Sequence, residues 1–251
     1  TGNTDSAKRI GGDLAMHWSR SAPITFAHRG ARAQAPENTV EAFVLARRLG
    51  ATGLESDAWV TADGVAVLDH DGVVGCGLHQ RPIAELNRRD LPAHIPELAD
   101  LYAACGTDYP LSLDVKDTDA VHAVLDVAGQ AGAVGDLWLC HHDWRTVASW
   151  RQLSEDFHLV DSTHLRAMHD GPERRAAQLA DAGVDAVNLH HREWTADLTA
   201  LVHRHELLAF AWDAQHEIIL DSMLDMGIDA VYSDHVDRMN DAVARAYASG
   251  L

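Results

Sequence analysis

Positive charge is scarce in this sequence. Lysine and arginine total 20 against 38 aspartate and glutamate residues, which gives a formal net charge of −18. Binding to nucleic acid or to an anionic lipid surface needs a basic face, so the composition argues against both partners. A phosphate bound by this chain therefore has to be held by local positive charge, from a few basic residues or a metal ion, against the overall field.

Cysteine is scarce as well. The three cysteines, Cys76, Cys105 and Cys140, are widely spaced and form no CxxC pair. This predicts free or buried thiols rather than a disulfide framework or a zinc knuckle. Free thiols favour a reducing compartment, so we expect a cytoplasmic location. Secretion after removal of a leader stays open, because the chain starts at Thr1 and not at methionine.

Long apolar runs are lacking too, so we expect no stable membrane insertion. Hydrophobic residues nevertheless make up 47% of the 251 residues, which is enough for a large buried core. We predict a single domain over residues 1–251. Nothing in the sequence specifies the oligomeric state.

Strand-like and helix-like segments alternate along the chain, which indicates a parallel sheet. About eight such units in a chain of this size predict a TIM (β/α)8 barrel. Residues 71–95 have no clear periodicity and are predicted to form a short insertion after strand 2. A doubly wound open sheet is the rival, but it requires a glycine-rich turn that Gly30-Ala31-Arg32 does not supply. The predicted barrel strands cover residues 24–27, 53–60, 110–115, 136–139, 157–160, 186–189, 207–212 and 230–233.

The first helix carries a start signal. Asn38 is predicted to be its N-cap, because Glu41 follows three residues later in a capping-box arrangement. Gly50 is predicted to end the helix.

Polar residues that can do chemistry follow the first strands. Glu55 and Asp57 lie two residues apart, so both side chains point to the same side of the second strand. The others stand at or just after strand ends, namely His28, Arg29, His70, Asp114 and Lys116. Because the carboxyl ends of the strands in a TIM barrel meet at one mouth, we expect these groups to converge there.

The chemistry of this set indicates a metal ion beside a phosphate. Three carboxylates, Glu55, Asp57 and Asp114, repel one another unless a cation neutralises them. Oxygen ligands favour Mg²⁺ or Ca²⁺, with Mn²⁺ as a further candidate. Taken singly, each acid could be a solvated side chain or half of a weak surface ion pair. Their shared position on one rim favours a site, in which two histidines suit opposed proton-transfer roles.

The motifs resemble those of the glycerophosphodiester phosphodiesterase family. The resemblance spans about residues 24–240, and the combination is far more specific than any single piece. It is carried by His28-Arg29-Gly30, Pro36-Glu37-Asn38-Thr39, Ala42-Phe43, Glu55-Ser56-Asp57 and His70-Asp71.

The resemblance implies a TIM barrel and a divalent-metal-dependent hydrolase. The implied reaction cleaves a small-molecule glycerophosphodiester to glycerol 3-phosphate and an alcohol. The resemblance makes His28 and His70 the acid/base pair and Arg29 a phosphate contact. It makes Glu55 and Asp57 metal ligands.

The third metal position departs from the family. An E-x-K segment is usual there, whereas this chain has Asp114-Val115-Lys116, one methylene shorter at the acid. Sphingomyelinase D-like enzymes are similar in using aspartate, so lysophospholipase D or sphingomyelinase D-like cleavage of lipids is one alternative. A non-catalytic phosphate-binding barrel is another. Lys116 and Trp212 are assigned to substrate binding.

Two histidine pairs invite a second metal site, His141-His142 and His190-His191. Adjacent residues of a strand point to opposite faces. We therefore expect one histidine of each pair to be buried and the other to face outward, without binding a metal.

Overall fold

Eight parallel strands close into a barrel in the computed structural model, which describes residues 22–248. β1 pairs with both β11 and β2, and this double pairing closes the ring. The predicted TIM barrel is confirmed, and the open-sheet rival is wrong because a closed ring has no free edges. The barrel strands are β1 (Ile24–Ala27), β2 (Gly53–Val60), β6 (Leu111–Val115), β7 (Leu137–His141), β8 (His158–Ser162), β9 (Ala186–His190), β10 (Leu208–Trp212) and β11 (Ala230–Ser233).

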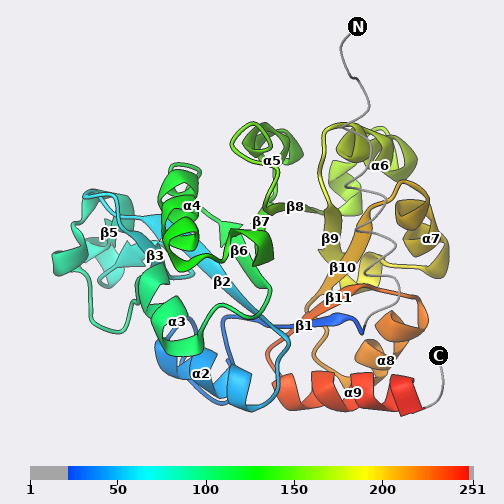
Figure 1. The fold of residues 1–251 in the computed structure, drawn as a ribbon, viewed down its shortest axis with the longest axis horizontal. Coiled ribbons are helices and arrows are strands. Elements are labelled where there is room, and N and C mark those ends of the chain that lie inside the picture. The colour runs from blue at the N-terminus through cyan, green and yellow to red at the C-terminus, as the bar shows by residue number, and fades with distance from the viewer. Residues whose placement is uncertain (1–21, 249–251) are drawn as a thin grey trace, which may run out of the picture.

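Helices cover the outside of the strands (Figure 1). Within residues 22–248, no helix is both long enough and apolar enough to cross a bilayer. The helices are α2 (Val40–Arg48), α3 (Leu98–Cys105), α4 (Ala120–Ala131), α5 (Trp144–Trp150), α6 (Pro172–Asp181), α7 (Ala196–Arg204), α8 (Glu217–Asp225) and α9 (Val236–Ala248).

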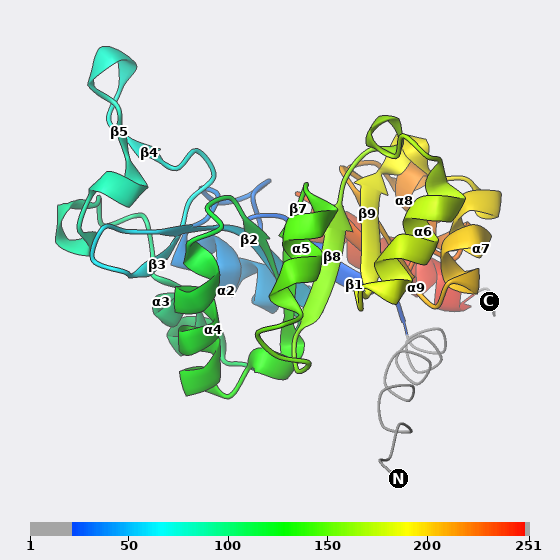
Figure 2. The ribbon, with the colours of Figure 1, turned by 90° about the horizontal axis from the view of Figure 1, so that it is seen from above.

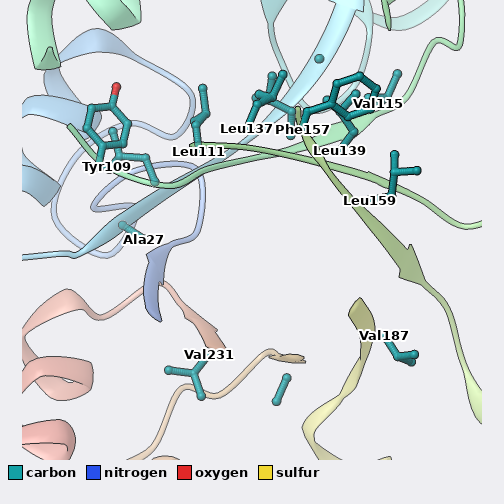
Figure 3. Packing of buried hydrophobic residues seen from close by; sticks show 14 of the residues in the cluster. Ala27, Tyr109, Leu111, Val115, Leu137, Leu139, Phe157, Leu159, Val187 and Val231 are labelled. Carbon is teal, nitrogen blue, oxygen red and sulfur yellow. The ribbon is translucent and has the colours of Figure 1, made fainter. Parts of the chain in front are cut away.

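The core has two layers because strand side chains alternate between the faces of the sheet. Leu137 and Leu139 of β7 point outward and pack in the layer between strands and helices, together with Leu159 of β8 (Figure 3). Phe26 and Phe210 point inward and fill the barrel with a second cluster. This filled interior leaves the polar strand ends as the place for a site.

The segment after β2 leaves the barrel. β3 (Ala66–Leu68) runs antiparallel to β2, and the short strands β4 (Val73–Val74) and β5 (Arg81–Pro82) then form a ribbon of their own. Figure 2 shows this ribbon projecting beyond the barrel. A small cluster that includes Ile83 and Leu86 packs beneath it, so the predicted insertion carries its own core. The assignment of all 251 residues to one domain stays a prediction.

The predicted cap of the first helix is wrong by one residue. Thr39 is the N-cap, and its side chain accepts a hydrogen bond from the Ala42 amide at 3.2 Å. Asn38 instead turns into the protein with a φ of +53° and is 4% exposed. Threonine and asparagine both cap helices well, so the buried partners of Asn38 decide between them.

Candidate active site

A cavity of about 470 Å³ lies at the carboxyl ends of the barrel strands. Side chains from both halves of the chain line this cavity, so the cavity forms only when the barrel closes. Seven of the eight predicted site residues line it, namely His28, Arg29, Glu55, Asp57, Asp114, Lys116 and Trp212.

His28 is held by a carboxylate. Its Nδ1 lies 2.7 Å from Asp234 Oδ1, so the proton on Nδ1 is donated to Asp234 and Nε2 is left for chemistry. Nε2 lies 3.9 Å from Glu55 Oε2. Burial lowers the pKa of His28. The carboxylates of Glu55 and Asp234 raise it by more, so the net pKa is above its usual value. Burial raises the pKa of Asp234, but the hydrogen bond from His28 and the charges of His28 and Arg32 together outweigh it, and the net pKa is lowered.

Glu55 is a buried carboxyl group with little compensation. It is 6% exposed, and its Oε2 accepts a hydrogen bond from the Arg29 amide at 2.9 Å. Burial raises the pKa of Glu55 to about 7, and the neighbouring Asp57 adds to the rise while His28 opposes it. Negative charge at this position is therefore poorly balanced by the protein alone.

Three side chains contact the Asp57 carboxylate, those of Asn38, Lys116 and Arg29. Asn38 Nδ2 donates to Oδ2 at 3.1 Å, and Lys116 Nζ lies 3.3 Å from Oδ1. Arg29 Nε lies 3.2 Å from Asp57 Oδ2, but its N–H is not directed at that oxygen. This contact is therefore an ion pair without a hydrogen bond. Arg29 also donates from its Nη1 to Glu37, at 3.1 Å and 3.2 Å to the two carboxylate oxygens.

Lys116 lies between two carboxylates in the cavity wall. Its Nζ donates to Asp114 Oδ2 at 2.5 Å and also reaches Asp57. Burial lowers the pKa of Lys116, but Asp114 and Asp57 outweigh it and raise the net pKa, so the amine stays charged. The Asp114–Lys116 pair is thus part of the cavity and not a pair on the outer surface.

The carboxylates supply the donor type that a hard divalent cation prefers, although among the described residues they are not a group whose ligand atoms all lie within 4.8 Å of one another. Glu55, Asp57 and Asp114 stand on the neighbouring strands β2 and β6, where Asp57 and Asp114 are register partners. All donors are oxygens, as Mg²⁺ and Ca²⁺ prefer, and the raised pKa of Glu55 marks charge that a cation would balance.

His70 is the predicted residue that the structure does not bring into the cavity wall. Its side chain is 39% exposed, and its Nδ1 lies 2.8 Å from Asp71 Oδ1. The segment is nevertheless tied to the site, because the Asp69 amide donates to the Asp57 carbonyl at 3.1 Å. The catalytic role of His70 stays a prediction.

Sequence reasoning gave no role to Asp234 or Gln215. Gln215 Oε1 accepts hydrogen bonds from the Asp234 amide at 2.9 Å and from Ser233 Oγ at 3.0 Å, which fixes the turn after β11. The position of Asp234 directly after a strand was the available signal. Gln215 lies in a loop and carried none.

The histidine pairs depart from strict strand alternation. His141 is buried and His142 exposed, as expected, yet their rings lie 4.2 Å apart. His190 and His191 are both half-buried, with rings 4.4 Å apart. The expectation of one inward and one outward side chain is wrong for the second pair, because β9 ends at His190. With Asp213, this pair forms a possible metal-binding cluster.

The tryptophans separate into two kinds. Trp212 lines the cavity, where its ring meets His190 edge-on at 4.5 Å and His164 at 5.8 Å. Trp138 is buried in the barrel interior, and Trp59 donates from Nε1 to the Asp69 carbonyl at 2.8 Å.

The fold and the cavity define a class, the TIM-barrel proteins whose mouth joins a carboxylate cluster to basic side chains and an aspartate-bound histidine. Residues 28–238 match the Glycerophosphoryl diester phosphodiesterase family, and the chain belongs to this family.

The relatives agree with this assignment. The chain is 40% identical over 108 residues to human glycerophosphodiester phosphodiesterase 1, a match that covers 36% of this chain and 33% of the human protein. The chain thus spans about a third of the length of that relative. A solved structure from Silicibacter pomeroyi that bears the family's name is similar with a TM-score of 0.81 and 22% identity, covering 90% of this chain and 94% of that one.

A further solved structure is that of an Oleispira antarctica phosphodiesterase in complex with the product sn-glycerol-3-phosphate. It has a TM-score of 0.77 and 20% identity, and covers 92% of this chain and 99% of that chain. At these identities, the two solved structures support the barrel fold.

Proposed function

We propose that this chain hydrolyses glycerophosphodiesters to glycerol 3-phosphate and an alcohol. The observation that carries the proposal is that His28, whose Nδ1 is held by Asp234, lies in one cavity with the carboxylates of Asp57 and Asp114. Family membership and the glycerol 3-phosphate found in the Oleispira antarctica phosphodiesterase support the same substrate class.

One divalent cation belongs to this proposal, Mg²⁺ or Ca²⁺, with Mn²⁺ also compatible. Glu55, Asp57 and Asp114 would hold it, since these acids of the cavity wall stand on the neighbouring strands β2 and β6. When bound, such an ion would polarise a phosphoryl oxygen and balance developing negative charge.

The basic side chains orient the substrate. The Arg29 guanidinium and the Lys116 amine bind non-bridging oxygens of the phosphate, and both stay charged through the reaction. Trp212 provides the apolar wall against which the glycerol or alcohol group packs.

Two histidines move the protons. One takes the proton of the glycerol 2-hydroxyl, whose oxygen then attacks phosphorus. The other gives a proton to the alcohol oxygen as the bond from phosphorus to that oxygen breaks, and a cyclic phosphate forms. Water then opens the cyclic phosphate to glycerol 3-phosphate. We assign these steps to His28 Nε2 and to His70, with the order of their roles left open.

An assay of phosphodiester cleavage tests the proposal. Glycerophosphocholine, glycerophosphoethanolamine and lysophosphatidylcholine are compared with and without Mg²⁺ or Ca²⁺. We expect cleavage of the first two, loss on chelation, and loss of several orders of magnitude in the variants His28→Ala and His70→Ala. His122→Ala, at an exposed position of α4, is the matched control.

The other outcomes identify the alternatives. Preference for lysophosphatidylcholine would replace the proposal with lysophospholipase D-like activity. Saturable binding of glycerophosphodiesters without turnover would make the chain a binding barrel. Normal turnover in His70→Ala would remove that residue from the scheme.

The predicted cytoplasmic location stays a prediction. All three cysteines are free thiols, with Cys76 exposed and Cys140 buried. Free thiols are compatible with a reducing compartment.

A further inference from the structure

We propose a second cation site at the barrel mouth, formed by His190, His191 and Asp213 and selective for a divalent transition-metal ion of the Zn²⁺ class. Each of these residues offers one ligand atom, and the three atoms lie within 4.8 Å of one another. An ion between them requires only small side-chain movements, because metal–ligand bonds of about 2 Å set ligand atoms about 3 to 4 Å apart.

The barrel itself assembles this cluster. β9 and β10 run side by side, and the last residue of each is paired, His190 with Trp212. Asp213 directly follows β10, and His191 opens a short 3-10 turn after β9. Two neighbouring strand ends therefore bring two imidazoles and a carboxylate together, as they do for the carboxylates of the cavity.

Neighbouring groups hold two of the three residues in place, His190 and Asp213. His190 Nδ1 accepts a hydrogen bond from the Arg192 amide at 3.1 Å, so Nε2 carries the ring proton and donates it to Asp213 Oδ2, 3.1 Å away. An ion bound at Nε2 would take the place of this proton, and the proton would move to Nδ1 in exchange for the Arg192 contact. Gln215 Nε2 donates to the other oxygen, Asp213 Oδ1, at 3.3 Å. A partner such as Gln215 fixes the orientation of a ligating carboxylate in known metal sites.

The backbone of Asp213 is strained. Its φ is +62°, in the left-handed region that residues other than glycine seldom adopt. Strain of this kind persists where the surroundings hold a residue in place, often at a functional site. Here it turns the carboxylate toward His190.

An unpaired acceptor stands in the same wall. Asn188 lines the cavity, as Asp213 does, and it lies two residues before His190 on β9, so the side chains of Asn188 and His190 leave the strand on the same side. Asn188 is 6% exposed, and its Oδ1 has no hydrogen-bond partner, although its Nδ2 donates to Ser162 Oγ at 3.1 Å. A buried carbonyl oxygen without a partner is costly, and a ligand bound at this wall, including ion-bound water, would satisfy it.

The donor set selects the class of ion. Two imidazole nitrogens and one carboxylate oxygen suit Zn²⁺, Co²⁺ or Ni²⁺, whereas Mg²⁺ and Ca²⁺ favour all-oxygen sites such as the one around Glu55. The two sites would therefore load different ions. This inference does not rest on the proposed function, because its test measures binding and not turnover.

The experiment is a Co²⁺ titration of the chelator-treated full chain in excess Mg²⁺, followed by d–d absorption and calorimetry. We expect about one equivalent of Co²⁺ with the spectrum of a nitrogen-ligated ion, displaced by Zn²⁺. The variants His191→Gln and Asp213→Asn should each weaken binding by at least about tenfold. Asp57→Asn should leave the Co²⁺ affinity unchanged.

The pair His141-His142 gives the matched control, because it has the same adjacent rings without belonging to the cluster. His142→Gln should bind Co²⁺ as the native chain does. Thermal melting without metal establishes that each variant is folded. Co²⁺ binding that is absent from the native chain, unchanged in both cluster variants, or lost in Asp57→Asn would overturn the proposal.

Discussion

His28 Nδ1 and Asp234 Oδ1 lie 2.7 Å apart and join the end of the first barrel strand to the end of the last. β1 and β11 are paired throughout, with Ala27 opposite Ser233, so this contact exists only because the barrel closes. The bond leaves Nε2 as the ring nitrogen available for the proposed proton transfer. In the proposed reaction, Asp234 is therefore a positioning residue, which acts through the imidazole of His28.

Asp234→Asn should lower kcat/KM by on the order of 10²-fold while the fold is kept. Asp234 raises the pKa of His28, so its neutralisation should also move the limb of the pH–rate profile that reports His28 to lower pH. Steady-state kinetics across pH measures both effects. Asp237→Asn, at an exposed position in the first turn of α9, is the control. An unchanged pH profile in Asp234→Asn would show that Asp234 does not set the state of His28.

Asn38→Ala should destabilise the protein by about 3 kcal/mol, from the loss of two buried hydrogen bonds and from a left-handed backbone now carried by alanine. Asn38 Nδ2 donates to Asp57 at 3.1 Å, and its Oδ1 accepts from Ser56 Oγ at 2.7 Å. Urea denaturation measures the change.

Asn38→Gly is the matched comparison for that experiment. It removes the same two hydrogen bonds but relieves the φ of +53°. The glycine variant should therefore be the more stable of the two by about 1 kcal/mol. Equal stability of both variants would show that the backbone conformation at this position carries no strain.

The same residue shows what sequence reasoning reaches and where it stops. The alternation of strands and helices and the charged strand ends predicted the barrel and seven residues of its cavity wall, because both follow from local periodicity. The role of Asn38 did not follow, because it is set by Asp57 and Ser56, 19 and 18 residues away. Asp234 stands directly after a strand, but its partner His28 is 206 residues away, so its contact with the imidazole could not be predicted from the local sequence.

His70 is a residue whose position the sequence suggested but whose side-chain direction it did not. Its place after a hairpin suggested a position on the rim, yet the turn from Asp69 to Gly72 leaves the side chain 39% exposed beside Asp71. The direction in which a loop side chain points depends on turn geometry, which the sequence pattern specifies less strictly than strand register.

Asp114→Asn should weaken Mg²⁺ or Ca²⁺ binding by at least about 100-fold, since even outer partners of a metal cost 10- to 100-fold when lost. Asp114→Glu, which restores the longer side chain usual in the family, should keep both binding and activity. Calorimetric titration with each ion reads the affinities. Asp126→Asn, exposed on α4, is the control. Full affinity in Asp114→Asn would remove this residue from the ligand set.

His158→Phe should make the protein less sensitive to acid. The His158 ring stacks on Trp138 at 4.1 Å, and burial lowers the pKa of His158 to about 4 from a usual 6.5. The folded state therefore keeps this imidazole neutral, while the unfolded chain takes up a proton below about pH 6.5. The stability that the neutral ring contributes is complete above that pH and is lost as the pH falls toward 4, by about 3 kcal/mol.

Phenylalanine keeps the stacking and removes the titration, so the difference in unfolding free energy between variant and native chain should shift by about 3 kcal/mol in favour of the variant between pH 7 and pH 4. The difference is the right quantity because burial raises the pKa values of Asp161 and Asp185 to about 6, and these groups change stability in the opposite direction over the same range. Their contribution is common to both chains and cancels. His122→Phe, at an exposed position, should show no such shift. A pH-independent difference for His158→Phe would mean that this histidine is already accessible to protons in the folded state.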